Sequence, residues 1–327
     1  MIVTVTPNPA LDLTYALADA VDADVDVHRA TASTLEASGK GVNVSRALAN
    51  AGVPTCAVFP AGGAVGRTLV ELLDDGGVAC RVVPQAGETR INTSALAPTG
   101  GTVKVNGPGA ALTLAEREGL LRETAVALEE ATAGAGGDRP WLAVCGSLPP
   151  GTDAALIADL VALAHRHGAV CAVDASGDAL AAAVHAGADL VAPNRFELAE
   201  VSAAARAAHS LDELATAAAA LSRESAAAVL VSLGRDGALY TDGRNTLHGW
   251  APPLVPVNTA GAGDALLSGW LSGRGAPASR LARAILWGRS ACLAAATVDP
   301  APGSGDPTEI TVSDLARTVL ASPSSDE

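Results

Sequence analysis

The segment Asn258–Asp264, which reads NTAGAGD, places a carboxylate after a run of small residues and directly before an apolar helix pattern. Small residues let the backbone turn tightly, and the first N–H groups of a helix lack partners and carry partial positive charge. Gly261, Ala262 and Gly263 would therefore bind an anion through backbone N–H groups, with Asp264 beside it as a base. An Asp that only caps a helix after a glycine turn has the same pattern, so this segment alone leaves both interpretations open.

A second glycine-rich segment, Ala37–Asn43, reads ASGKGVN and also precedes a helix pattern. It is not a P-loop, because the positions that need Gly and Ser/Thr hold Thr34 and Gly41. A Gly-Lys-Gly turn suits close approach to a sugar or phosphate, but an ordinary turn has the same sequence. The 21 basic residues include only two lysines, Lys40 and Lys104, so we expect Lys40 at a position that needs a compact ammonium rather than a guanidinium.

Two more segments follow apolar strand patterns in the second half of the chain. Asn194 and Glu197 would share one face of a first helical turn, where they would hold a hydrated Mg²⁺ or form a capping box. The run 232–237, in VSLGRDGA, would line the ribose and phosphates of a nucleotide or turn between two strands. The six histidines show no ligand spacing, and no Gly-x-Ser-x-Gly elbow supports a hydrolase triad.

Composition excludes several classes of protein. Of 327 residues, 49% are hydrophobic and 17% charged, which supplies a large core and excludes a disordered chain. A net charge of −14 argues against a nucleic-acid-binding surface, although a few local cations can still bind a small anion. We expect no membrane span and no secretory signal. Five cysteines without metal spacing indicate buried thiols in a reducing cytoplasm.

The elements that must position these segments alternate between strand and helix patterns, which predicts a parallel sheet covered by helices on both faces. The expected strands are Ile2–Thr6, Thr55–Pro60, Trp141–Cys145, Val170–Val173, Leu190–Ala192 and Ala228–Ser232. The expected helices are Val42–Ala51, Arg67–Asp74, Leu114–Ala131, Ala154–His167, Leu211–Arg223, and an adjacent pair at Ala262–Ser272 and Ser279–Ala296.

Two segments interrupt the alternation. Residues 12–37 and 89–106 read as half-exposed strands, the second with a Gly-Gly turn, and no helix follows directly. We expect them to pair as a small sheet that stands off the main domain and covers a site. The expected organisation is one domain over residues 1–321 with a flexible tail at 322–327.

Taken together, these segments resemble the PfkB group of ribokinase-like sugar kinases. TPNPALD, SGKGVNVSRALA, CGSLPPG, APNRFE, VSLGRDGA and NTAGAGDALLSG occur in the order that this family has, through nearly the whole chain. The resemblance implies a three-layer α/β/α fold with a mostly parallel sheet and a small β-sheet lid. It also implies an ATP-dependent kinase that phosphorylates an alcohol group of a sugar.

The resemblance assigns roles residue by residue. For catalysis it implies Asp264 as the base that takes the proton of the attacking hydroxyl, and a backbone anion hole at Gly261, Ala262 and Gly263. For the sugar phosphate it implies binding by Asp12, Asn43, Gly39, Lys40, Arg90, Arg29 and Asn106. For ATP it implies binding by Asn194, Ser232, Gly234, Gly237, Thr259 and Gly263. Mg²⁺ would be organised through water by Asn194 and Glu197.

Within the group, the chain looks most like 1-phosphofructokinases, which implies conversion of fructose 1-phosphate to fructose 1,6-bisphosphate. A 6-phosphofructokinase and a tagatose-6-phosphate kinase stay open as alternatives. A sensor that binds sugar phosphate or nucleotide without catalysis is disfavoured by the intact GAGD run. The family also implies a homodimer through the lid. Two departures concern the nucleotide side: Ala260 replaces a larger residue, and Asp299, near the end of the last long helix, stands where relatives commonly carry Asn.

Overall fold

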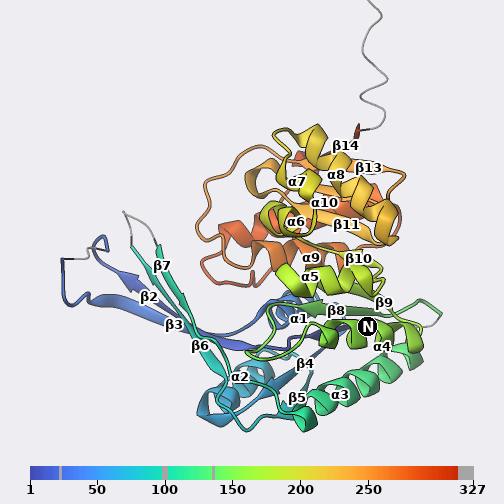
Figure 1. Cartoon of the computed structure of the whole chain (residues 1–327). Helices are drawn as coiled ribbons and strands as arrows, with labels where there is room; N and C mark the ends of the chain where they lie inside the picture. The colour runs from blue at the N-terminus through green and yellow to red at the C-terminus, as the bar shows by residue number, and fades with distance from the viewer. Residues whose placement is uncertain (22–23, 98–101, 135–136, 316–327) are drawn as a thin grey trace, which may run out of the picture.

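The computed structural model describes residues 1–21, 24–97, 102–134 and 137–315, which form a layered body with a small sheet projecting from it (Figure 1). Within these residues the larger sheet has ten strands in the order β14-β13-β12-β11-β10-β9-β8-β1-β4-β5. Neighbours from β11 to β5 pair in parallel, while β12, β13 and β14 pair antiparallel at the other edge. The expected mostly parallel sheet is confirmed.

The strands of the larger sheet are short and mostly buried. Their bounds are β1 Ile2–Val5, β4 Thr55–Ala61, β5 Cys80–Pro84, β8 Trp141–Cys145, β9 Val170–Asp174, β10 Leu190–Val191, β11 Ala228–Ser232, β12 Ala238–Thr241, β13 Thr246–Trp250 and β14 Thr311–Asp314. In β1, Val3 and Val5 pack on one side of the sheet and Ile2 on the other. Apolar residues on both faces are what a sheet buried between two helical layers requires.

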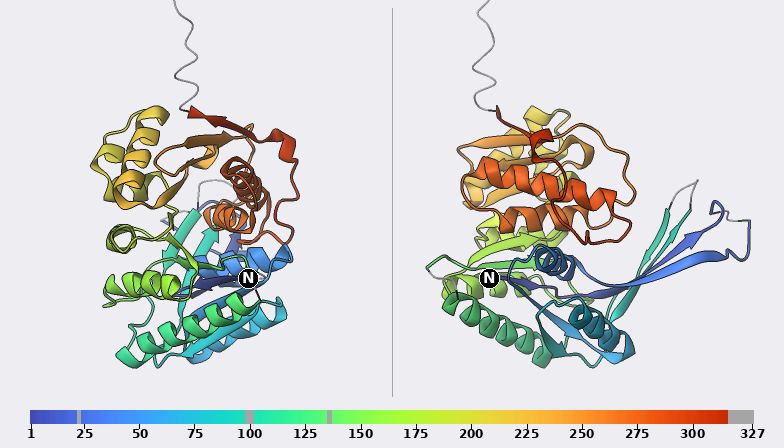
Figure 2. Two further views of the ribbon diagram at one scale, coloured as in Figure 1. Left: turned by 90° about the vertical axis from the view of Figure 1, so that its right-hand side faces the viewer. Right: turned by 180° about the vertical axis from the view of Figure 1, so that it is seen from behind.

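Helices cover both faces of this sheet and complete the three layers. One layer, in front in Figure 1, holds α3 Leu114–Ala133, α4 Ala155–Arg166, α5 Gly177–His185, α6 Arg195–Val201, α7 Ala203–Arg206 and α8 Leu211–Ser225. The opposite layer, in front in the right-hand view of Figure 2, holds α1 Lys40–Asn50, α2 Gly63–Asp75, α9 Ala262–Ser272 and α10 Pro277–Leu293. The starts of α1 and α9 are the parts that build the site.

The small sheet, called the lid here, has the order β3-β2-β6-β7. Its strands are β2 Ala10–Leu17, β3 Ala30–Ser38, β6 Arg90–Leu96 and β7 Thr102–Asn106, so both segments expected to form a lid contribute a pair of strands. The central pair, β2 with β6, is parallel and the outer pairs are antiparallel. The predicted Gly-Gly turn at residues 100–101 lies outside the described residues.

The two faces of the lid differ in character. Asp12 pairs with Asn92, and Asn92 with Asn106, so these polar side chains share one face. The alternate positions carry Tyr15, Leu35, Ile91, Val103 and Val105, which are 36–62% exposed. Because side chains alternate along a strand, the register places these apolar residues on the opposite face.

Several predicted bounds were wrong or incomplete. The last helix begins at Pro277, which suits the first helical position, and ends at Leu293 rather than Ala296. Asp299 therefore lies in the loop after α10, not near its end. Its buried carboxylate accepts hydrogen bonds from the Ser290 hydroxyl and from the N–H of Ala301. The Asp299 carboxylate therefore joins this loop to α10 and stabilises its backbone turn at Ala301. The elements β5, β14, α5 and α7 were not predicted, whereas the helical turn expected at Asn194 and Glu197 is the start of α6.

Candidate active site

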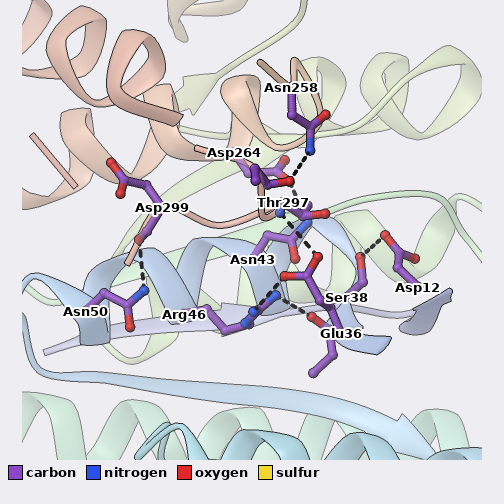
Figure 3. Close-up of polar contacts among 12 residues, drawn as sticks. Asp12, Glu36, Ser38, Asn43, Arg46, Asn50, Asn258, Asp264, Thr297 and Asp299 are labelled. Carbon is purple, nitrogen blue, oxygen red and sulfur yellow. Dashed lines mark hydrogen bonds and ion pairs between the residues drawn. The ribbon is translucent and has the colours of Figure 1, made fainter. Parts of the chain in front are cut away.

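Asp264 lies in the first turn of α9, and its side chain is buried. The Nδ2 of Asn43, on α1, donates a hydrogen bond of 2.8 Å to its Oδ2 (Figure 3). Burial raises the pKa of Asp264 to about 7, and the nearby carboxylate of Asp174 adds to the rise; the hydrogen bond from Asn43 and the charge of Lys40 oppose it. A carboxylate with a pKa near neutrality can accept a proton at working pH.

The turn into α9 contains the residues predicted to form the anion hole. Gly261 adopts the left-handed conformation (φ 76°) as the N-cap, and no side chain caps this end of the helix. A Cβ at Gly261 would lie 2.1 Å from the carbonyl oxygen of Thr297, so only glycine fits. At Gly263 a Cβ would meet nothing within 4 Å, which leaves open space beside the helix start. The conformation at Gly261 fits the predicted anion hole, which stays a prediction.

A cavity of about 280 Å³ lies between the lid and the edge of the large sheet. Its lining is polar and includes Asn8, Ser38, Gly39, Lys40, Asn43, Arg90, Asn92, Asn106, Gly146, Ser147, Ser176 and Glu197. Asn43, which lines this cavity, is also the hydrogen-bond partner of Asp264. The cavity therefore connects the predicted sugar-binding residues to the predicted base.

A hydrogen-bond network at the foot of the lid holds Asp12 in place. Its Oδ2 accepts from the Ser38 hydroxyl at 2.7 Å, and its Oδ1 accepts from Nδ2 of Asn92 at 2.8 Å. A Cβ at Gly39 would lie 2.8 Å from the side chain of Thr6, and the φ of Gly39 is 111°. The backbone at Gly39 is therefore closely packed against Thr6. Both features fix the floor of the cavity.

The two cations of the cavity differ in their partners. Lys40 Nζ lies 2.7 Å from Oδ1 of Asp174 and 3.5 Å from Oε1 of Glu197. Burial alone would lower the pKa of Lys40, but the attraction of Asp174, with Glu197 and Asp264, outweighs it and raises that pKa. The ammonium is therefore always charged and already paired with protein carboxylates.

Arg90 has more donors to offer than Lys40. Its Nη1 donates to the carbonyl oxygen of Gly107 at 3.2 Å, while its Nε is buried with no partner within the described residues. Burial lowers the pKa of the guanidinium, an effect that Asp12 partly opposes. A buried N–H without a partner is costly, so an anionic ligand at this position would be bound favourably.

Among the residues predicted to bind the sugar phosphate, Arg29 lies at the outer end of the lid, away from the cavity. It is exposed and precedes Ala30, which pairs with Leu17 at the outer end of β2 and β3. Ser38, at the other end of β3, lines the cavity. This chain alone does not bring Arg29 to the sugar.

Asn194 and Glu197 form the capping box of α6. Asn194 Oδ1 accepts from the N–H groups of Phe196 and Glu197, and Glu197 Oε2 accepts from the N–H of Asn194. Only Oε1 of Glu197 is turned toward the cavity cations. Among the described residues no group of three or more His, Cys, Asp or Glu could hold a metal ion directly. A metal that is bound through water, as the family resemblance implies, needs only an oxygen that can accept a hydrogen bond from that water, such as Oε1 of Glu197.

The predicted nucleotide residues lie at neighbouring strand ends. Ser232 ends β11 and forms an isolated bridge with Asn194. Gly234 (φ 62°) begins a short 3₁₀ turn, and Gly237 (φ 89°) packs so closely on Gly249 that no side chain would fit. Thr259 is exposed, and its carbonyl accepts from the N–H of Ala262 at the start of α9.

Several residues of the site were not predicted. Asn8 and Ser147 line the cavity and contact each other at 3.5 Å. Asp174 ends β9 and pairs with Lys40. The cavity lining also includes Ser38, Asn92, Gly146, Ala175 and Ser176. Asn8 and Ser147 lie inside segments that carry the family resemblance, TPNPALD and CGSLPPG, so their position in those segments was the available signal. A carboxylate at the end of a predicted parallel strand was the signal for Asp174.

The described helices include none long and apolar enough to span a membrane. The buried Asp264, predicted to be the base, lies at the glycine-rich start of α9 and is bonded to Asn43, which lines the polar cavity under the lid. The sequence matches the pfkB family of carbohydrate kinases over residues 6–306, and the chain belongs to that family.

Relatives and solved structures agree with this family. The ATP-dependent 6-phosphofructokinase isozyme 2 of Escherichia coli K12 is 37% identical over 73% of this chain and 75% of its own. The 1-phosphofructokinase of Haloferax volcanii is 36% identical over 84% of each chain. The E. coli phosphofructokinase-2 solved with substrates and products superposes with a TM-score of 0.81 at 32% identity, covering 94% of this chain and 96% of that one.

Proposed function

We propose that this kinase phosphorylates fructose 1-phosphate at its 6-hydroxyl, using ATP and releasing fructose 1,6-bisphosphate and ADP. The observation that carries the proposal is the pairing of Asp264 with Asn43 at a cavity that also presents Arg90. Asp264 can accept the proton of the attacking hydroxyl, and Arg90 can hold a phosphate already on the sugar. The reaction needs both at once.

Asp264 supplies the base in this proposal. The sugar oxygen forms a bond to the γ-phosphorus, the bond from that phosphorus to the β–γ bridging oxygen breaks, and the hydroxyl proton passes to Asp264. The N–H groups that follow Gly261 stabilise the negative charge on the transferred phosphoryl group. Such charge stabilisation and alignment supply most of the catalysis in phosphoryl transfer.

Arg90 is the primary receptor for the substrate phosphate in this proposal. Its Nε lacks a partner, whereas Lys40 is already neutralised by Asp174. A guanidinium can bind a phosphate through two parallel hydrogen bonds. Asn106 lines the same cavity from the lid. We assign the ring hydroxyls to Asn43, which lines the cavity, and to Asp12, which is bonded to the cavity residues Ser38 and Asn92.

ATP and Mg²⁺ complete the reaction. We place the nucleotide along Ser232, Gly234, Gly237 and Thr259, with its phosphates directed at the start of α9. When bound, Mg²⁺ would neutralise part of the negative charge of the triphosphate. Glu197 Oε1 is the oxygen suited to hold it through water, because Oε2 is used in the capping box.

Fructose 6-phosphate is the second candidate acceptor, because the E. coli relative named 6-phosphofructokinase isozyme 2 is 37% identical. In the furanose ring the primary carbons 1 and 6 stand on either side of the ring oxygen. A cavity that binds a phosphate at one end and a hydroxyl at the other therefore suits both substrates. Tagatose 6-phosphate differs from fructose 6-phosphate at one hydroxyl and is the third candidate.

We also propose a homodimer formed through the apolar face of the lid. Tyr15, Leu35, Ile91, Val103 and Val105 would be covered in such a pair, and an exposed apolar sheet face otherwise favours aggregation. All five cysteines are free, which fits a reducing cytoplasm as the place where the enzyme works.

A coupled assay of ADP release tests the substrate. Fructose 1-phosphate, fructose 6-phosphate and tagatose 6-phosphate are compared at equal ATP and Mg²⁺, and kcat/KM is measured for each. The proposal expects fructose 1-phosphate to be preferred by at least tenfold. A higher kcat/KM with fructose 6-phosphate would make the second candidate the function. Sugar-phosphate binding without ADP release would support a sensor instead.

A further inference from the structure

We propose that Glu36 is a positioning residue that ties lid strand β3 to the loop beside the anion hole. This inference rests on the proposed function, since it concerns how the two halves of that site are held together. Glu36 lies two residues from Ser38 at the inner end of β3, and its side chain is 14% exposed. Each of its carboxylate oxygens contacts a different part of the molecule.

One oxygen of Glu36 binds α1. Arg46 Nη2 lies 3.2 Å from Oε1 of Glu36, and Arg46 Nη1 donates to the carbonyl oxygen of Ala37 at 2.7 Å (Figure 3). Arg46 stands three residues after Asn43, so both side chains lie on neighbouring parts of the same helix face. The helix that carries the partner of Asp264 is thereby fixed to the lid.

The other oxygen of Glu36 binds the loop that follows α10. The N–H of Thr297 donates to Oε2 of Glu36 at 3.3 Å, across 261 positions of sequence. The carbonyl oxygen of the same Thr297 closes the space around Gly261, where a Cβ would approach within 2.1 Å. A single peptide segment therefore connects Glu36 to the residue that begins the anion hole.

Glu36 is also close in sequence to the cavity, because Ser38 lies two residues after it. Side chains at alternate positions of a strand share a face, so Glu36 and Ser38 project the same way from β3. Ser38 donates to Asp12 and lines the cavity. A sugar that contacts Ser38 would therefore lie two residues from Glu36. Glu36 in turn holds Thr297, which packs against Gly261.

Glu36 does not line the cavity, so its contribution is alignment rather than binding. Without its carboxylate, the Thr297 loop and the turn at Gly261 can shift relative to the lid and α1. Displacements of about 1 Å at a reacting centre cost up to about 10²-fold in rate. The structure therefore assigns to Glu36 an effect on kcat that exceeds its effect on the KM for sugar.

The test uses the full-length enzyme and the variants Glu36→Gln and Glu36→Ala. Glutamine keeps one acceptor and the shape of the side chain, while alanine removes both contacts. The control is Glu123→Gln, the same chemical change in an ion pair between Glu123 and Arg81 on α3 and β5, away from the site. We expect kcat to fall about tenfold in Glu36→Gln and further in Glu36→Ala, with the sugar KM within threefold of wild type and Glu123→Gln unchanged.

Hydrogen exchange of the peptide that contains Thr297 gives a readout besides activity. Loss of both Glu36 contacts should accelerate exchange at this amide by tenfold or more in Glu36→Ala. The increase should be smaller in Glu36→Gln, which keeps one acceptor, and absent in Glu123→Gln. If Glu36→Ala does not fold, Glu36→Gln carries the test. A kcat within twofold of wild type, a rise in sugar KM without a fall in kcat, or unchanged exchange would each overturn the inference. A wild-type enzyme inactive on all three ketohexose phosphates would contradict the proposed function instead, while the exchange comparison would still test the link.

Discussion

Asn43 and Asp264, 221 positions apart in sequence, are joined by a hydrogen bond of 2.8 Å between Nδ2 and Oδ2. The bond connects the start of α1, next to the lid, with the start of α9, next to the anion site. The Oδ1 of Asn43 is buried without a partner among the described residues, so the amide has a free acceptor at the cavity. The proposed base and the proposed sugar site therefore share one contact.

The raised pKa of Asp264 predicts the pH profile of the enzyme. The group must be deprotonated to act as a base, and its pKa is raised from 3.8 to about 7, so kcat should fall as the pH drops below 7. Asp174→Asn removes a neighbouring negative charge and frees Lys40, and both changes lower the pKa of Asp264. The acidic limb of kcat against pH should then move to lower pH, as measured with saturating substrates.

Asp174→Asn needs a control that keeps the neighbouring charges. Asp159→Asn on α4 changes an exposed ion pair with Arg117 on α3 and should leave the acidic limb where it is. An acidic limb in the wild-type enzyme near pH 4 to 5 would show that Asp264 titrates like an ordinary carboxyl and would contradict this account.

Arg90 is predicted to act in sugar-phosphate binding. Arg90→Met keeps much of the side-chain volume and removes every donor, so the KM for the sugar phosphate should rise by about 10²-fold or more, the cost of losing a charge-assisted pair. The KM for ATP should change little. Steady-state kinetics with each substrate varied in turn measures both values.

Arg29→Met is the informative companion to Arg90→Met. Arg29 is exposed beyond the outer end of the lid, so within one chain its loss should not change the KM for sugar phosphate. If Arg29→Met raises that KM in the dimer but has no effect in a variant whose lid pair is disrupted, a second chain supplies Arg29. Unchanged kinetics in Arg90→Met would remove Arg90 from the phosphate site.

Gly261 is predicted to tolerate no side chain. Gly261→Ala places a Cβ 2.1 Å from the carbonyl of Thr297 at a φ of 76°, so the turn must move. We expect kcat to fall by about 10² or more, as when an oxyanion donor is lost, and the melting temperature to drop. Gly263→Ala is the matched control for stability, because its Cβ meets nothing within 4 Å. Equal melting temperatures in the two variants would refute the packing argument.

The lid pair is predicted to depend on its apolar face. Val105, 62% exposed, lies on that face, and Val105→Asp should convert the dimer to a monomer in light scattering after size exclusion. Lys104→Asp introduces the same side chain on the opposite face of β7 and should leave the dimer intact. A wild-type enzyme that is monomeric at micromolar concentration would exclude the lid pair.

Local patterns predicted much of the fold and the positions of most site residues. Strict alternation of strand and helix predicted the parallel sheet, and half-polar strands without a following helix predicted the lid. What could not be predicted is contact between distant segments. Nothing near Lys40 in sequence indicates that Asp174 neutralises it, and nothing near Thr297 indicates its bond to Glu36.

The missed elements have a similar cause. Helix α5, GDALAAAVH, is nine residues of small side chains whose apolar face is decided by packing rather than by pattern. Strand β5, CRVVP, lies at the sheet edge, is only partly buried and contains an arginine, so it lacks the continuous apolar run that identified the central strands. For Arg29, the family resemblance indicated a phosphate contact, yet the fold of one chain holds it at the far end of the lid.

The most direct measurement of the central claim is the turnover of Asp264→Asn with fructose 1-phosphate and ATP. Asparagine keeps the size of the side chain and an oxygen that can accept from Asn43, but it cannot take a proton. We predict that kcat falls by about 10³-fold or more while the KM for sugar phosphate stays within a few-fold of wild type. Phosphorylation at a near wild-type rate would contradict the assignment of Asp264 as the base.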